Sequence, residues 1–134
     1  MFKTLFYGGL SVIGTVMADS KDRVTALPGF DITEPLYSGY LEVTTTKKLH
    51  YVFVESKNNA KTDPVLIWFN GGPGCSSMLA FSTEHGPYNL PDGETVFVKN
   101  EHSWNKEANV LYVEQPAGVG FSTCNNEKYP ESCE

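Results

Sequence analysis

The pattern of apolar and polar residues predicts a series of short strands separated by loops. β-branched and aromatic residues are enriched over residues 37–45 and again over residues 49–54. A short polar connection at residues 46–48 separates the two stretches. Runs of this length, joined by a few polar residues, are typical of a β-hairpin. The first predicted elements are therefore two antiparallel strands.

Two further stretches, residues 65–69 and 110–113, are apolar without interruption. Their length fits a strand, and unbroken hydrophobicity predicts burial on both faces of a sheet. Residues 76–85 begin with two serines, which suit the start of a short helix. Residues 96–98 predict one more short strand. Strands mixed with a short helix indicate an α/β fold.

Both apolar stretches run directly into glycine-rich loops. The first loop reads Asn-Gly-Gly-Pro-Gly-Cys-Ser-Ser over residues 70–77, and the second reads Gln-Pro-Ala-Gly-Val-Gly over residues 115–120. In an open α/β sheet, ligands bind outside the carboxyl ends of the strands. The two loops therefore mark a candidate active face.

The loop at residues 70–77 has a composition suited to holding negative charge. Glycines turn tightly and present unhindered N–H groups, and the loop leads into the predicted helix. A phosphate ligand is disfavoured because neither Gly-Lys-Ser/Thr nor Gly-x-Gly-x-x-Gly follows this strand. An oxyanion of acyl transfer fits better, since α/β-hydrolases place a glycine-rich loop after a central strand. A purely structural turn is the alternative.

The length of the chain limits the number of domains, and its charge limits the kinds of partner. The chain has 134 residues, enough for one domain, and 16 acidic against 10 basic residues give a formal net charge of −6. The basic residues are scattered, with Lys47 and Lys48 as their one adjacent pair. Nucleic acids and anionic membrane surfaces both need clustered Lys and Arg, so the sequence argues against either as a partner.

The N-terminus predicts a secretory signal. Lys3 is the only charged residue before Asp19, residues 4–16 are apolar, and small residues close the stretch. This apolar run is too short to span a bilayer, and its positive start is typical of a signal peptide. We expect cleavage directly before Asp19, which makes residues 1–18 the signal and 19–134 the mature domain. A buried first strand or helix is the alternative.

If residues 1–18 direct secretion, the three cysteines of the chain enter an oxidising compartment. Cys124 and Cys133 are near enough in sequence to close a small loop, whereas Cys75 lies alone in the glycine-rich turn. An odd number of cysteines leaves one thiol without an internal partner.

A resemblance to a known family rests on residues 68–77, Trp-Phe-Asn-Gly-Gly-Pro-Gly-Cys-Ser-Ser. This block is similar to the oxyanion-loop signature of the serine carboxypeptidases. Further pieces agree with that family in order and spacing: residues 27–30, 37–40, 84–87 and 114–122. Thr123 stands where the family usually has Tyr. The resemblance covers residues 27–122 and implies the N-terminal strands, with one or two short helices, of an α/β-hydrolase-type sheet.

The family releases the last residue of a peptide with a Ser, Asp and His triad. Transferred to this sequence, the resemblance implies that the Gly72 N–H stabilises the oxyanion. It implies that Asn70, the Gly71 backbone and Glu84 hold the substrate's terminal carboxylate, with Trp68 supporting them. Glu84 can help only when protonated, because two adjacent carboxylates repel. That condition favours activity in acid, as in a lysosome or vacuole, although an extracellular location is equally open.

The family's nucleophile lies in a Gly-x-Ser-x-Gly elbow, and this pattern occurs nowhere in the chain. The triad's Asp and His follow the nucleophile in such hydrolases. We therefore expect His50, His85 and His102 to be structural or exposed. In the family, Cys75 pairs with a cysteine far along the chain.

The sequence thus predicts the N-terminal portion of a serine-type carboxypeptidase without its triad. Peptide or protein C-termini are the expected substrates, and neither a cofactor nor a metal ion is expected. Two alternatives stay open: a relative that transfers the acyl group to a non-peptide acceptor, and a non-enzymatic fragment.

Overall fold

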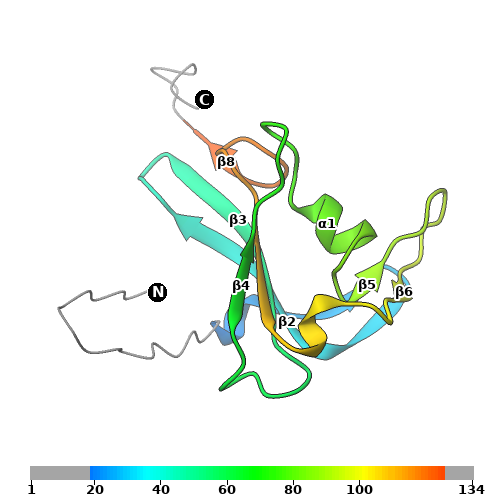
Figure 1. Ribbon diagram of the computed structural model, residues 1–134. Helices are drawn as coiled ribbons and strands as arrows, with labels where there is room; N and C mark the ends of the chain where they lie inside the picture. The colour runs from blue at the N-terminus through cyan, green and yellow to red at the C-terminus, as the bar shows by residue number, and fades with distance from the viewer. Residues whose placement is uncertain (1–18, 126–134) are drawn as a thin grey trace.

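The computed structural model describes residues 19–125 (Figure 1). The predicted signal peptide, residues 1–18, and the candidate disulfide residue Cys133 lie outside the described residues.

A mixed sheet forms the body of the molecule. Its strands are, in spatial order, β1 (Arg23–Leu27), β2 (Phe30–Glu42), β3 (Lys47–Val54), β7 (Asn109–Val113) and β4 (Val65–Trp68), and β8 (Thr123–Cys124) also pairs with β3. Neighbouring strands are antiparallel except β4 and β7, which are parallel. The predicted hairpin is confirmed as β2 and β3, and the apolar stretch at residues 110–113 forms β7.

The remaining elements are short and lie mainly beside one face of the sheet. The predicted helix is confirmed as α1 (Met78–Thr83), and single 3-10 turns form η1 (Ser20–Asp22) and η2 (Trp104–Lys106). The strand predicted at residues 96–98 occurs slightly later, as β6 (Val98–Lys99), which pairs with β5 (Tyr88–Asn89) in a separate two-stranded sheet.

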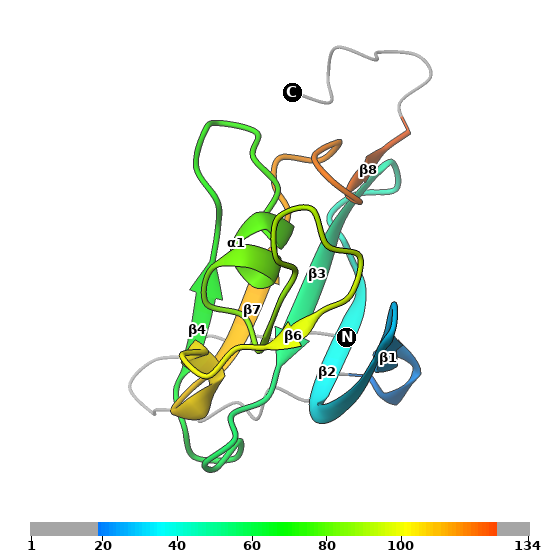
Figure 2. The same cartoon turned by 90° about the vertical axis from the view of Figure 1, so that its right-hand side faces the viewer.

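Alternating side chains of β3 and β7 build a core on each face of the sheet. Residues Val52, Val54, Val110 and Tyr112 face α1, where Ala80 and Phe81 pack against them. Figure 2 shows α1 in front of β7 on this side. The opposite face carries a second cluster, comprising Tyr51, Phe53, Leu111 and Val113. The two-residue period of a strand explains why consecutive residues of both strands are buried.

The prediction that residues 65–69 are buried on both faces is wrong. The stretch does form a strand, β4, but Leu66 is 40% exposed, Ile67 is 56% exposed and Phe69 is 46% exposed. The physical reason is position: β4 is the last strand of the sheet and pairs with β7 on one side only. Among the described residues, no strand lies beyond it to cover these side chains.

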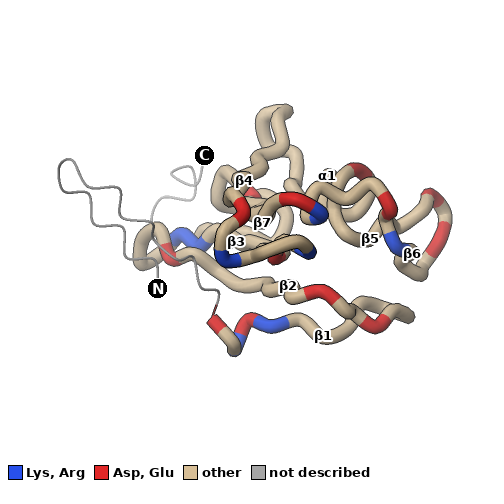
Figure 3. Tube along the Cα trace, turned by 60° about the horizontal axis from the view of Figure 1, so that its bottom comes forward, with Lys and Arg blue, Asp and Glu red and all other residues tan. Residues whose placement is uncertain are grey.

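Charge is spread over the fold rather than gathered. Figure 3 shows Lys and Arg at separated places along the tube, interspersed with Asp and Glu. In the part of the chain that the structure describes, no helix is long and apolar enough to cross a membrane.

The packing of α1 predicts unequal effects for two of its residues. Phe81 is buried against Tyr112 with ring centroids 5.5 Å apart, so Phe81→Ala should lower the free energy of unfolding by about 3–5 kcal/mol. Leu79 is 50% exposed on the same helix, so Leu79→Ala should change it by only about 0.5 kcal/mol. Urea unfolding of the 134-residue chain, followed by tryptophan fluorescence, measures both. Equal losses would contradict the packing described here.

Candidate functional site

The site is assembled where β4 and β7 end. These two strands run in parallel with Trp68 opposite Tyr112, so the loops that follow them start at the same edge of the sheet. The loop after β4 spans residues 69–77 and leads into α1, and the loop after β7 spans residues 114–122 and leads into β8. The two glycine-rich segments predicted to mark the active face are therefore neighbours.

Glycine is required in the first loop by its backbone geometry. Gly72 has a φ of +128°, which side-chain-bearing residues rarely adopt, and a Cβ there would lie 3.1 Å from the Cys75 backbone nitrogen. The Cys75 N–H donates to the Gly71 carbonyl at 3.1 Å and closes the turn. Within residues 19–125, the N–H groups of Gly71 and Gly72 donate to no protein acceptor, and both residues are exposed.

Ser77 closes the loop on itself and attaches it to the sheet. Its buried hydroxyl accepts the Asn70 N–H at 3.1 Å and donates to the Val113 carbonyl at 2.6 Å. One side chain thus fixes Asn70, near the start of the loop, to the loop's last residue and to the end of β7. An unpaired hydroxyl at this depth would be costly, so both contacts constrain the loop.

Trp68 sets the orientation of the Asn70 amide. The indole Nε1–H of Trp68 donates to Asn70 Oδ1 at 2.7 Å. Because the indole N–H can only donate, Asn70 Oδ1 is the atom turned towards it. The Asn70 NH₂ group is a donor, and it makes no hydrogen bond in the described part of the chain. It is therefore available to a ligand.

Trp68 packs in a cluster of aromatic rings with His85 and Trp104. His85 stacks on Trp104 with centroids 4.0 Å apart, contacts Trp68 edge-on at 4.5 Å, and its Nδ1 lies 3.0 Å from the Tyr112 hydroxyl. Burial lowers the pKa of His85, and the nearby Glu84 carboxylate opposes that effect. A neutral His85 can stack between rings without the cost of a buried charge.

Glu84 ends α1 and lies beside this cluster. Its carbonyl accepts the Asn100 side-chain amide at 3.0 Å, while its side chain is exposed and forms no hydrogen bond or ion pair with the described residues. Its charge acts on His85 and, with burial as the larger cause, raises the pKa of Tyr112. The structure therefore brings Trp68 and Asn70 into direct contact, and Glu84 is linked to Trp68 through its neighbour His85.

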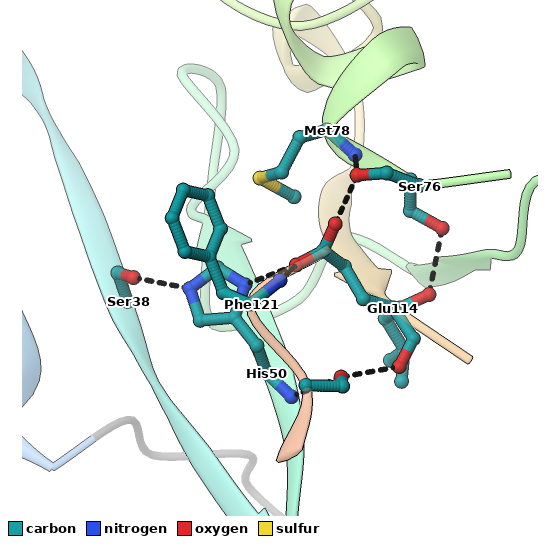
Figure 4. A network of polar contacts seen from close by, with 9 residues as sticks. Ser38, His50, Ser76, Met78, Glu114 and Phe121 are labelled. Carbon is teal, nitrogen blue, oxygen red and sulfur yellow. Dashed lines mark hydrogen bonds and ion pairs between the residues drawn. The ribbon is translucent and has the colours of Figure 1, made fainter. Parts of the chain in front are cut away.

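Glu114, to which the sequence motifs give no chemical role, lies at the centre of a polar network (Figure 4). This carboxylate is fully buried, with 0% exposure. It accepts hydrogen bonds from the Ser76 hydroxyl and, at 2.8 Å, from the Phe121 N–H. The one available signal was an acidic residue directly after a buried strand.

His50 is the ionisable partner of Glu114. Its Nδ1 lies 3.0 Å from Glu114 Oε2, and its Nε2 lies 2.8 Å from the Ser38 hydroxyl. Burial is the largest effect on His50 and lowers its pKa, and Glu114 opposes that shift. His50 and His85 are thus buried structural residues, and His102 is exposed, as expected.

Two of the three cysteines lie in the part of the chain that the structure describes. Cys75 has a free, exposed thiol in the first loop, and Cys124 lies in β8. Since Cys133 falls outside the described residues, the disulfide assignments stay predictions.

A comparison with protein families identifies the family of this chain. The sequence profile of the family described as "Serine carboxypeptidase" matches residues 28–133. The chain belongs to the serine carboxypeptidase family. The match includes both glycine-rich loops and every residue discussed above as a candidate site residue.

Individual relatives agree with the family assignment. The chain is 49% identical over 115 residues to the mouse (Mus musculus) lysosomal protective protein, which covers 84% of this chain and 24% of that protein. It is 43% identical over 127 residues to the Caenorhabditis elegans serine carboxypeptidase ctsa-3.1, covering 91% of this chain and 22% of that protein. It is also 43% identical over 136 residues to the Arabidopsis thaliana serine carboxypeptidase-like 20, covering 95% of this chain and 27% of that protein. The chain spans about a quarter of the length of these relatives.

A solved structure supports the fold. The prohormone-processing carboxypeptidase Kex1 from Saccharomyces cerevisiae superimposes with a TM-score of 0.58 at 30% identity, covering 71% of this chain and 22% of that one. The expected fold class is confirmed: a sheet-dominated α/β fold with few short helices, consistent with the N-terminal part of an α/β-hydrolase-type sheet.

The His50–Glu114 contact predicts a titration that can be measured by NMR on the histidine ring of the 134-residue chain. We expect a pKa for His50 below its ordinary value of 6.5, because burial outweighs the attraction of Glu114. Stability contributed by neutral His50 is then fully present above about pH 6.5 and is lost as pH falls through the lower folded-state pKa.

Glu114→Gln provides the matched test of that sign. It removes the charge that opposes the shift, so the pKa of His50 should fall further. The same chain unfolded in urea gives the reference titration. A pKa that rises in Glu114→Gln would show that the assigned causes are wrong.

Proposed function

We propose that this chain supplies the oxyanion loop and the carboxylate-binding residues of a serine-type carboxypeptidase. Such an enzyme releases C-terminal residues from peptides through an acyl-enzyme, and its substrates are peptide or protein C-termini. Membership of the family and the geometry of residues 68–77 support this function.

The observation that carries the proposal is the hydrogen bond from Trp68 to Asn70 Oδ1. It leaves the Asn70 NH₂ group available to donate to another partner, and the exposed backbone N–H of the next residue, Gly71, is a second available donor. Two neutral donors on adjacent residues suit a carboxylate, because each carboxylate oxygen accepts hydrogen bonds and none of its atoms donates. The proposed ligand is therefore the free C-terminal carboxylate of a peptide.

Gly72 has a separate role in the proposal. Its N–H donates to the oxyanion that develops when the scissile carbonyl is attacked. A donor placed for that charge typically stabilises the transition state by about 3–4 kcal/mol. The positive φ of Gly72 and the closed turn at Cys75 support a fixed direction for this N–H.

Glu84 completes the carboxylate site when it is protonated. An ionised Glu84 would repel the substrate carboxylate, whereas a protonated one donates a hydrogen bond to it. Activity should then be highest in acid. That preference fits the secretory pathway and an acidic compartment such as a lysosome or vacuole, and a relative bears the name lysosomal protective protein.

The carboxylate site predicts a difference between two kinds of substrate. In a full-length carboxypeptidase that carries this chain, Asn70→Ala and Glu84→Ala should lower kcat/KM for free-acid peptides about ten- to a hundredfold. Peptide amides should lose much less, because they lack the charge that these residues bind. Steady-state kinetics on matched acid and amide substrates measures the ratio.

Two observations complete this test. Glu84→Gln keeps a donor at every pH, so it should extend activity towards neutral pH with some loss at the optimum. Equal losses on acid and amide substrates in Asn70→Ala would contradict the proposed carboxylate site.

The 134-residue chain by itself should hydrolyse no blocked dipeptide at any pH. It has no Gly-x-Ser-x-Gly pattern, and oxyanion stabilisation without a nucleophile leaves little rate. The assay is release of the C-terminal amino acid from acid to neutral pH. Turnover that a serine-directed phosphonate blocks would mean that a nucleophile has been overlooked.

A further inference from the structure

Glu114 connects the oxyanion loop to the rest of the sheet. Its Oε1 accepts the hydroxyl of Ser76, the residue that directly follows Cys75. The Ser76 hydroxyl in turn accepts the N–H of Met78, the first residue of α1, at 3.1 Å. One carboxylate oxygen therefore holds the end of the loop and the start of the helix together.

The other oxygen of Glu114 is held by segments distant in sequence. Glu114 Oε2 accepts the Phe121 N–H at 2.8 Å from the second loop and lies 3.0 Å from His50 Nδ1 on β3. His50 cannot easily turn, because Ser38 holds its Nε2 at 2.8 Å and the Tyr40 and Phe121 rings contact it edge-on. The carboxylate thus has one orientation, in which Oε1 faces Ser76.

Gly120 in the second loop leaves the space that the Glu114 carboxylate occupies. A Cβ built on Gly120 would overlap the Glu114 carboxylate, and Gly120 has a φ of +55°. Figure 4 shows the carboxylate between Ser76 on one side and His50 on the other. A buried carboxylate is tolerated only with donors around it, and here both oxygens have them.

We propose that Glu114 is a positioning residue that fixes the oxyanion loop through Ser76, so that the Gly72 N–H keeps its direction during catalysis. This inference rests on the proposed function of Gly72. Glu114 itself touches neither substrate nor the reacting atoms. Hydrogen bonds to its two oxygens tie the first loop to β3 and to the second loop.

Three substitutions separate this role from simple packing. Glu114→Leu fills much of the same space but offers no acceptor to Ser76, Phe121 or His50. Glu114→Gln keeps one oxygen for the Oε2 donors and an amide that can donate to the Ser76 hydroxyl. Ser76→Ala removes the hydrogen bond to Glu114 together with the one from the Met78 N–H, and it leaves the Phe121 and His50 contacts of Glu114 in place. Ser82→Ala is the matched control, since the Ser82 hydroxyl donates to the Met78 carbonyl at 2.6 Å on α1, away from Glu114.

The first readout is amide hydrogen exchange in the 134-residue chain, followed at the Asn70 and Cys75 N–H groups. Both amides are hydrogen-bonded inside the loop. Ser76→Ala and Glu114→Leu should speed their exchange about tenfold or more, whereas Glu114→Gln and Ser82→Ala should change it by less than about threefold. If Glu114→Leu does not fold, Ser76→Ala against Ser82→Ala decides. Equal exchange in those two variants, or Glu114→Gln as fast as Glu114→Leu, overturns the proposal.

The second readout is kinetic and separates this inference from the carboxylate site. In a full-length carboxypeptidase carrying this chain, Ser76→Ala should lower kcat about tenfold with KM nearly unchanged, and equally for acid and amide peptides. Asn70→Ala discriminates between those substrates if the proposed function holds. A raised KM at unchanged kcat in Ser76→Ala overturns the positioning role, and it leaves the result for Asn70 intact.

Discussion

Parallel pairing of β4 with β7 places the carboxyl ends of both strands at one edge of the sheet, with Trp68 opposite Tyr112. Everything in the candidate site follows from this alignment. The loop after β4 can reach the end of β7, so Ser77 binds the Val113 carbonyl and Ser76 binds Glu114. An antiparallel β4 would put the same loop at the opposite edge, away from both acceptors.

Buried polar contacts then convert a glycine-rich loop into a defined shape. Glycines permit the turn but cost conformational entropy, and nothing in their own side chains restrains it. Restraint comes from Ser77 at the sheet and from Glu114 through Ser76, both in places where an unmade hydrogen bond would be expensive. The exposed donors at Gly71 and Gly72 and the half-buried Asn70 amide are thus held in place by buried contacts. These buried contacts include His50 on β3, which lies far from the loop in sequence and contacts Glu114.

Part of this arrangement could be predicted from the sequence. The β2–β3 hairpin and β7 follow from runs of β-branched and aromatic residues, and the loop block identifies Trp68, Asn70 and Gly72 as candidates. Strand β1 carries no such pattern and is held by pairing with β2, which a local pattern cannot reveal. Exposure of β4 depends on what lies beyond the sheet edge, not on its own residues. Glu114 was missed because its partner His50 is 64 positions away, and only the β3–β7 register brings them together.

The central claim is that the first loop binds the free carboxylate of a peptide. NMR titration of the ¹⁵N-labelled 134-residue chain with a blocked dipeptide and with its amide tests it most directly. The account predicts that the acid shifts the Gly71 and Gly72 backbone amides and the Asn70 side-chain amide, with a larger effect at acid pH, and that the amide leaves them nearly unchanged. Equal shifts with both ligands, or shifts elsewhere but none in this loop, would contradict it.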